Sequence, residues 1–218
     1  MGELSFKDEA ATAYDQAVAH VSAHFLPFLL RAARLEPGQR VLDAATGTGI
    51  AAEGALAVVG PGGHVTAADN SQAMVDRARQ RLGGSPNASV MVDDGQSLSF
   101  DDGSFDAVLC SFGLMFFPDP ARGLSEFYRV LRPGGRAAVS VLTTPERSYN
   151  GRINVVIARR VPSLAEATAR TFSIGDEARL RSLLDGAGFR DVEITTEAHV
   201  FVFPSFDAYF DPFERGGG

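Results

Sequence analysis

Residues 41–50, with the sequence VLDAATGTGI, restrict the possible folds more than any other segment of this chain. They join a short apolar run to a glycine-rich turn. Gly47 and Gly49 let the backbone turn sharply and approach a ligand closely, because neither carries a side chain. The helix expected to begin near Ile50 points free N–H groups toward the same place. The segment therefore predicts a strand, a tight turn and a helix that together bind a nucleotide cofactor.

The acid in this segment restricts the choice of cofactor. A carboxylate at Asp43, directly before the turn, repels the pyrophosphate of a dinucleotide and attracts an ammonium or sulfonium group. S-adenosylmethionine carries both cations. Together with the segments below, the stretch resembles motif I of the class I S-adenosylmethionine-dependent methyltransferases, with Ala45 where that family most often has its first glycine. We expect the cofactor to contact Asp43, Ala44, Ala45, Thr46, Gly47 and Gly49.

A second acid ends the next expected strand, at Asp69. A carboxylate there can accept hydrogen bonds from both ribose hydroxyls, because its two oxygens have the matching spacing. NAD-binding proteins use the same device, so this residue does not distinguish the two cofactors. Asn70 and Met74 follow and are expected to lie against the nucleoside, although Met74 at helical spacing also suits a core. Ser71 is expected to cap the following helix.

Residues 92–108 also resemble the methyltransferase family. In that family an acid after the third strand binds the adenine amino group, and a Phe-Asp pair opens the fourth strand, as at Phe105 and Asp106. The resemblance assigns the adenine contact to Asp94 and Gly95 rather than to Asp93. It also implies cofactor contacts by Ser111 and Phe112 at the end of the fourth strand.

The order of elements is typical of an α/β protein with a parallel sheet covered on both faces. Helices are expected over Asp8–Arg34, Ile50–Val59, Gln72–Arg81, Pro120–Leu131 and Asp176–Asp185. Strands are expected over Arg40–Asp43, His64–Ala68, Ser89–Val92, Asp106–Ser111 and Arg136–Leu142, with Asp191–Thr196 and His199–Phe203 as a closing antiparallel hairpin. The prediction is a seven-stranded, mostly parallel, Rossmann-like sheet.

One domain is expected for 218 residues with 45% hydrophobic content. Within residues 1–218 we divide it into an N-terminal lid helix (1–35), a cofactor-binding core (36–142), a substrate-side insertion (143–175) and a closing helix and hairpin (176–204). The insertion shows no clear periodicity.

Composition excludes several classes of function. A formal net charge of −7 with scattered arginines disfavours a nucleic-acid surface. No apolar run is long enough to span a bilayer, and the N-terminus lacks the features of a signal peptide, so we expect a cytoplasmic protein. Cys110 is the single cysteine, in an apolar run that suits an inert buried thiol. No metal site is expected, because the one histidine pair has no obvious partner ligands.

The acceptor of the methyl group is expected to be a small apolar organic molecule, because the insertion suggests a lid over an apolar pocket. The similarity is nearest to the methyltransferases of ubiquinone and menaquinone biosynthesis. Candidate acceptor contacts are Tyr14, Met115, Phe116 and Tyr149. Methyl transfer consists mainly of alignment and needs no dedicated base for every acceptor, but His20 and His24 are candidates if one is required.

Two alternatives remain at this point. A cofactor-binding regulatory protein without methylating activity would keep the same three acids. An NAD(P)-dependent oxidoreductase is disfavoured by Asp43, by the Asp94-Gly95 pair and by the closing hairpin.

Overall fold

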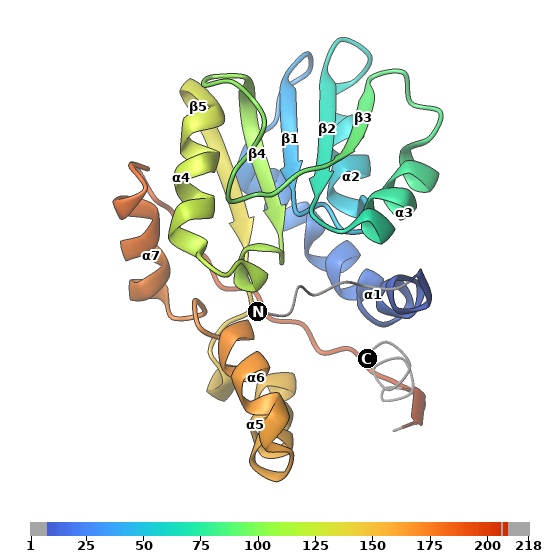
Figure 1. Ribbon diagram of the computed structural model, residues 1–218, viewed down its shortest axis with the longest axis vertical. Coiled ribbons are helices and arrows are strands. Elements are labelled where there is room, and N and C mark those ends of the chain that lie inside the picture. The colour runs from blue at the N-terminus through green and yellow to red at the C-terminus, as the bar shows by residue number, and fades with distance from the viewer. Residues whose placement is uncertain (1–7, 206, 209–218) are drawn as a thin grey trace.

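The structure is a computed structural model that describes residues 8–205, 207 and 208, without the side chains of residues 8–18 and 164. Five strands form one parallel sheet in the order β3-β2-β1-β4-β5 (Figure 1). Their bounds are β1 (Arg40–Ala44), β2 (His64–Asp69), β3 (Ala88–Val92), β4 (Phe105–Ser111) and β5 (Leu131–Ser140). The chain order reverses between β1 and β4, which is where ligands bind in open α/β sheets.

Helices cover both faces of the sheet. One face carries α1 (Asp8–Ala33), α2 (Ile50–Val59) and α3 (Gln72–Leu82), and the other carries α4 (Pro120–Val130) and α7 (Glu177–Gly186). Neighbouring residues of β1 point to opposite faces, so Val41 packs with α2 while Leu42 packs with α4. Both are fully buried, as expected for a central parallel strand.

Short polar caps fix where the later helices begin. Asp119 accepts a hydrogen bond from the backbone N–H of Arg122 at the start of α4, and Asp176 does the same for Arg179 at the start of α7. Pro120 occupies the first turn of α4, where its missing N–H costs nothing. These caps orient α4 and α7 against the same face of the sheet.

The segment expected to be irregular contains helices. After the short turns η1 (Leu114–Phe116) and η2 (Pro145–Arg147) come α5 (Tyr149–Arg160), η3 (Pro162–Leu164) and α6 (Ala165–Thr171). The Ser148 hydroxyl caps α5 by accepting from the N–H of Gly151. Figure 1 shows α5 and α6 projecting beyond the carboxyl ends of the strands, away from the sheet.

The prediction of seven strands with a closing hairpin was wrong for the described part of the chain, which has five strands. Residues 191–203 form no strand there, and Asp191 has left-handed backbone with φ 53°. Arg34 pairs with Glu193, and Arg181 donates to the carbonyl of Val192. Side-chain contacts therefore hold this segment where backbone pairing of two strands was expected. The closeness of two strand candidates in the sequence does not by itself specify their pairing.

Among the residues that the structure describes, no helix is both long and apolar enough to cross a bilayer.

Candidate active site

The loop after β1 is held to β2 by two hydrogen bonds from its backbone and is closed by a third within the loop. The N–H of Thr46 donates to the carbonyl of Ala68 at 2.9 Å, and the N–H of Gly47 donates to Oδ2 of Asp69 at 2.9 Å. The N–H of Gly49 closes the turn on the carbonyl of Thr46. A methyl group added to Gly47 would meet no atom within 4 Å, so the backbone at this position faces open space.

Asp43 lies at the base of this loop and is completely buried. Its Oδ2 accepts a 2.5 Å hydrogen bond from the Thr46 hydroxyl, while its buried Oδ1 has no hydrogen-bond partner. Burial raises the pKa of Asp43 to about 7, against the opposing effects of Thr46 and the backbone at Ala52 and with a smaller contribution from the charge of Asp69. An unpartnered buried carboxylate oxygen is costly unless a cation or donor joins it.

Asp69 holds the turn together from the end of β2. Besides Gly47, it accepts the N–H of Ser71 at 2.9 Å on Oδ1, so each oxygen already has one backbone donor. Burial raises its pKa, and the two N–H donors partly oppose this shift. Each carboxylate oxygen can accept more than one bond, which leaves capacity for ribose hydroxyls. Ser71 occupies the N-cap position of α3, but its side chain makes no capping hydrogen bond.

The residues directly after β1 and β4 both have left-handed backbone. Ala45 has φ 53° and Phe112 has φ 52°. The N–H of Phe112 donates to the carbonyl of Ser140 at 3.0 Å and to its hydroxyl at 3.2 Å, so the turn after Ser111 is tied to β5. The Phe112 ring lies edge-on to Phe25 of α1, with 6.1 Å between centroids.

Asp93 and Asp94 have different roles in the loop after β3. Asp93 accepts hydrogen bonds from the backbone and hydroxyl of Ser99, which orders the loop. Asp94 is exposed, and its Oδ1 accepts the N–H of Gln96 at 2.9 Å. Gly95 lies under the ring of Phe117, where an added Cβ would stand 2.4 Å from Cζ. The adenine contacts of Asp94 and Gly95 stay predictions, and glycine at position 95 also has a packing reason.

An anchor for this loop was missed by sequence reasoning. Arg129 of α4 donates to the carbonyls of Phe100 and Leu98 and pairs with Glu126, whose carboxylate accepts the N–H of Leu98. The ion pair lowers the pKa of Glu126. The spacing of three residues between Glu126 and Arg129 is visible in the sequence, but the loop carbonyls to which Arg129 donates are not.

The remaining candidates lie in different surroundings. Met74 and Met115 are each 4% exposed and pack in the interior, whereas Phe116 and Tyr149 are 40% and 77% exposed. Asn70 is exposed beside Asp69, and Ala44 is buried in β1. Tyr14 lies in α1, but its side chain is outside the described part of the structure. Cys110 is buried in β4, and burial raises the pKa of its thiol to about 12, in keeping with an inert thiol.

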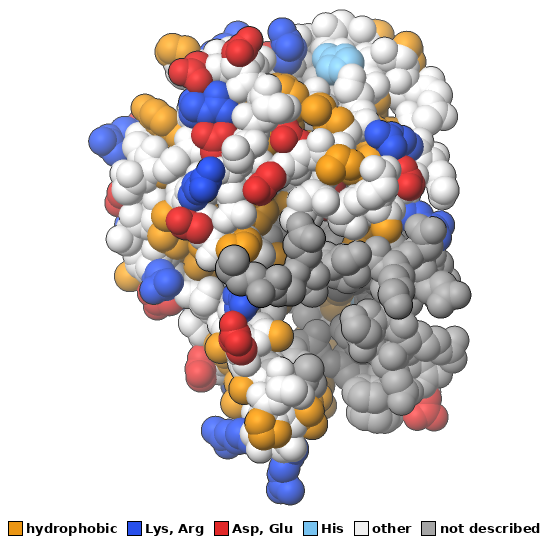
Figure 2. Space-filling model, in the orientation of Figure 1, with side chains coloured by type: hydrophobic (Ala, Val, Ile, Leu, Met, Phe, Trp, Pro, Cys, Tyr) orange, Lys and Arg blue, Asp and Glu red, His pale blue; other side chains and the backbone are white. Residues whose placement is uncertain are grey.

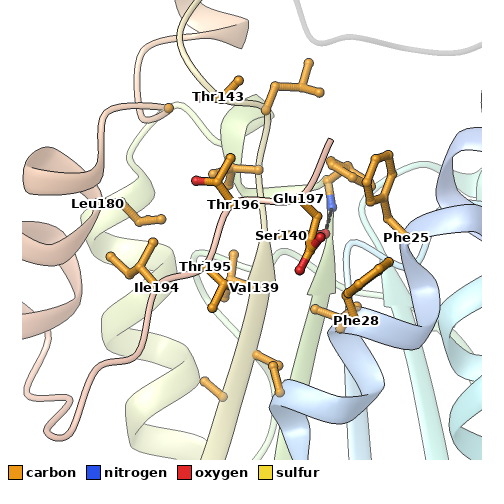
Figure 3. A pocket seen from close by; sticks show the side chains of 18 of the residues that line it. Phe25, Phe28, Val139, Ser140, Thr143, Leu180, Ile194, Thr195, Thr196 and Glu197 are labelled. Atoms are coloured by element: carbon orange, nitrogen blue, oxygen red, sulfur yellow. Dashed lines mark hydrogen bonds between the residues drawn. The ribbon is translucent and has the colours of Figure 1, made fainter. Parts of the chain in front are cut away.

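A large cavity of about 2130 Å³ begins beside Phe112 and extends along β5. Figure 3 shows Phe25 and Phe28 of α1 on one side, Val139 of β5 behind, and Leu180 of α7 and Ile194 opposite. Asp43 and Asp69 lie outside this lining. The molecule therefore has a polar cofactor cradle at β1 and β2 and a separate, mainly apolar space at β5.

The two histidine candidates, His20 and His24, make ring contacts with residues of the C-terminal segment. His24 lies against His199 with 3.7 Å between ring centroids and an angle of 32° between the ring planes, and His20 lies edge-on to Phe201 at 4.9 Å. His20, His199 and Phe201 all line the cavity. Burial lowers the pKa of His20, which favours its neutral form. His199 was not predicted, because 175 residues separate it from His24.

The cradle fits S-adenosylmethionine better than a dinucleotide. The unpartnered Oδ1 of Asp43 is suited to a cationic group, and the open face of Gly47 leaves room for a ligand against the backbone. Asp69 accepts the N–H of Gly47 in the same turn, and its contact with ribose hydroxyls stays a prediction. The fold and the site thus define a class I S-adenosylmethionine-dependent methyltransferase.

Comparisons with known proteins support the same class of enzyme. Residues 42–139 match the family model described as "Methyltransferase domain". The chain is 35% identical over 203 residues to the demethylmenaquinone methyltransferase of Clavibacter sepedonicus, covering 85% of this chain and 81% of that protein. It is 31% identical over 183 residues to the ubiquinone/menaquinone biosynthesis C-methyltransferase UbiE of Proteus mirabilis, covering 77% and 73%.

Solved structures show the same fold. A S-adenosylmethionine-dependent methyltransferase from Aquifex aeolicus aligns with a TM-score of 0.67 at 21% identity, covering 85% of this chain and 90% of that one. Phosphoethanolamine N-methyltransferase 2 of Haemonchus contortus, solved with S-adenosyl-L-methionine, aligns with a TM-score of 0.66 at 22% identity, covering 86% and 43%.

This chain belongs to the S-adenosylmethionine-dependent methyltransferases of the ubiquinone/menaquinone C-methyltransferase type. The expectation of a methyltransferase that uses S-adenosylmethionine is confirmed. The NAD(P)-dependent alternative is wrong.

Proposed function

We propose that this methyltransferase acts on a ring carbon of a reduced, quinone-type aromatic acceptor bound in the cavity beside Phe112. The observation that carries the proposal is the position of this cavity, which is mainly apolar and includes Phe112, in the turn after β4, in its lining. The relative from Clavibacter sepedonicus is a demethylmenaquinone methyltransferase, and a demethylated naphthoquinol is the acceptor we would test first.

The polar cradle at β1 and β2 and the cavity at β5 have different roles. When bound, S-adenosylmethionine would supply an electrophilic methyl group. The acceptor ring carbon would gain this methyl group and lose its hydrogen as a proton, while the electron pair of the broken sulfur–methyl bond would stay on sulfur. Asp43 and Asp69 hold the cationic and ribose parts on the polar side. Phe25, Phe28 and Phe112 exclude water on the other side, which favours direct displacement because a competing solvent shell is removed.

A base is useful for a phenolic acceptor, because loss of the hydroxyl proton makes the ring carbon more nucleophilic. We propose His20 and His24 for this step. Both lie on α1, and the lowered pKa of His20 keeps its ring neutral and able to accept a proton. His24 has the tilted ring of His199 against it at 3.7 Å between centroids, which restrains its orientation.

We also propose that the predicted N-terminal lid, of which the structure describes residues 8–35, covers the cavity and that residues 143–175 form the acceptor-side wall. Val21, Phe25 and Phe28 of α1 line the cavity, as do Arg147, Tyr149 and Asn154 of the insertion. Tyr149 is the insertion residue best placed to contact an acceptor at the cavity entrance, because it is largely exposed there.

The test is transfer of a labelled methyl group to a demethylnaphthoquinol with a short side chain, under reducing conditions. We expect labelled, ring-methylated product together with S-adenosylhomocysteine. Binding of S-adenosylhomocysteine without turnover on any quinol would instead support the regulatory alternative.

The base is tested by the His20→Ala/His24→Ala double variant, with His64→Ala at the far end of β2 as the matched control. We expect the double variant to lose turnover by about 10²-fold or more and to change its pH profile. Unchanged turnover in the double variant would remove both histidines from the mechanism.

A further inference from the structure

The insertion differs in charge from the rest of the chain. Between residues 143 and 175 the sequence contains five arginines and two glutamates, although the whole chain has a formal net charge of −7. The arginines are Arg147, Arg152, Arg159, Arg160 and Arg170. The acidic majority of the molecule therefore carries one compact basic projection, and the segment that carries it is the one that extends away from the sheet.

The same projection exposes large apolar side chains. Tyr149 is 77% exposed, Val156 is 58% exposed and Val161, directly after α5, is 42% exposed. Figure 2 shows hydrophobic and arginine side chains intermixed at the lower end of the molecule, where α5 and α6 lie in Figure 1. Exposed apolar groups among arginines do not suit a purely solvated surface.

Helical spacing places these two kinds of side chain on one face of α5. Tyr149, Arg152, Val156 and Arg160 follow each other by three, four and four residues, so they form one stripe along the helix. Arg159 lies beside Val156 on the same side by its spacing of three from it. Tyrosine and arginine are suited to a membrane interface, because each combines an apolar stem or ring with a polar end.

We propose that α5 and its flanking residues form a docking surface for an anionic lipid bilayer. The intermixed valines and Tyr149 would enter the boundary between headgroups and acyl chains, while Arg159 and Arg160 would lie at the level of the phosphates. The excess of arginine over glutamate in residues 143–175 complements an anionic lipid surface. Self-association through the same face is measured in the same experiment.

The docking surface adjoins the large cavity. Arg147, Tyr149, Asn150 and Asn154 belong to the cavity lining, and Tyr149 also belongs to the exposed stripe. A bilayer held against α5 would thus lie at the cavity entrance. An apolar molecule could then pass from the bilayer into the cavity with little exposure to water. The surface is inferred from charge and exposure alone, so it does not depend on the proposed acceptor.

The test is co-sedimentation of the full chain with vesicles of phosphatidylcholine alone and of phosphatidylcholine mixed with phosphatidylglycerol, at two salt concentrations. We expect binding to the anionic vesicles only, weaker at the higher salt concentration. Arg159→Glu/Arg160→Glu should reduce the partition constant at least about tenfold. Val156→Ser should reduce it less, without changing the salt dependence.

The matched control is Arg77→Glu/Arg79→Glu on α3, which makes the same change in net charge elsewhere and should retain most of the binding. Thermal unfolding of each variant verifies that it is folded. Equal binding to both vesicle types, equal loss in the control, or no binding by the unaltered chain would each overturn the proposal. So would concentration-dependent dimers that Arg159→Glu/Arg160→Glu dissociates. Because neither acceptor nor S-adenosylmethionine is added, these results are independent of methyl transfer.

Discussion

The methyl group of Ala45 lies directly against Gly113, where an added Cβ would stand only 2.6 Å from it. Ala45 begins this turn and has left-handed backbone, with φ 53°. Position 113 is buried between Ala45 and Cys110, so the two sites share one small space. The extra methyl group in the turn is thus accommodated by a glycine in the loop after β4.

This relationship predicts non-additive effects in a double-mutant cycle. Gly113→Ala should destabilise the protein by about 1–3 kcal/mol through overpacking. Ala45→Gly should change stability by less than about 1 kcal/mol, because relief of the left-handed strain offsets the entropy of glycine. The double variant should recover part of the loss from Gly113→Ala. Chemical denaturation of the four proteins measures the coupling, and strictly additive values would show that the two sites are independent.

A second prediction concerns Gly47, whose absent side chain faces open space. Gly47→Ala meets no protein atom within 4 Å, but it holds the residue at φ 56°. We expect a modest loss of stability, about 1 kcal/mol, from this backbone conformation. Affinity for S-adenosylhomocysteine should fall much more, because the methyl group occupies the space beside the cofactor. Calorimetric titration and denaturation of one sample separate the two effects.

The matched control for Gly47→Ala is Gly38→Ala, at φ 85° and also with no atom within 4 Å of the added methyl group. It lies before β1, away from the turn, so it should lose a similar amount of stability and keep its affinity. Equal affinity in the two variants would remove Gly47 from the cofactor site.

Asp69 combines binding with support of the turn. Asp69→Ala should weaken S-adenosylhomocysteine binding by about 1.5–3 kcal/mol, because charge-assisted hydrogen bonds are lost. It should also destabilise the turn, since the N–H groups of Gly47 and Ser71 lose their acceptor. Asp69→Asn keeps one acceptor oxygen, so its affinity and its stability should lie between those of Asp69→Ala and those of the unaltered protein. The exposed Asp76 of α3 provides the control, as Asp76→Asn, and an Asp69→Ala variant with unchanged affinity would contradict the ribose role.

The sequence was sufficient to predict the parallel sheet, its helices and the methyltransferase class, because those features depend on local signals. Val41 and Leu42 mark a buried strand, and Gly47 and Gly49 mark the turn that follows it. The residues at which α4 and α7 begin are also determined locally, as the caps at Asp119 and Asp176 show.

Other parts depended on contacts between distant residues, and the sequence did not specify them. Two strand candidates that follow each other closely in residues 191–203 predicted a hairpin, but His199 and Phe201 contact α1 in the structure. Similarly, Phe116 and Met115 looked equivalent, yet one is half-exposed and the other is buried in the core. Hydrophobic side chains in a loop do not reveal which of them meet a ligand, because packing decides this.

The last prediction concerns the protonation of Asp43. An aspartate in the unfolded chain titrates near pH 3.9, whereas burial raises the pKa of Asp43 to about 7 in the fold. Between these values the folded form holds a proton that the unfolded form has lost, so the free energy of unfolding falls as pH rises from about 4 to about 7. The full effect of Asp43 is at most about 4 kcal/mol, and Asp43→Asn should abolish it.

Denaturation of the ligand-free protein and of Asp43→Asn across this pH range provides the measurement, with the exposed Asp101→Asn as control. The stability of Asp43→Asn relative to the unaltered protein should increase with pH, while the difference for Asp101→Asn should stay nearly constant. S-adenosylhomocysteine should bind the unaltered protein more tightly as pH rises through 7, because its ammonium group favours the charged carboxylate. Parallel stability curves for the unaltered protein and Asp43→Asn would show that Asp43 titrates alike in the folded and unfolded states, and would remove the basis for a cation at its free oxygen.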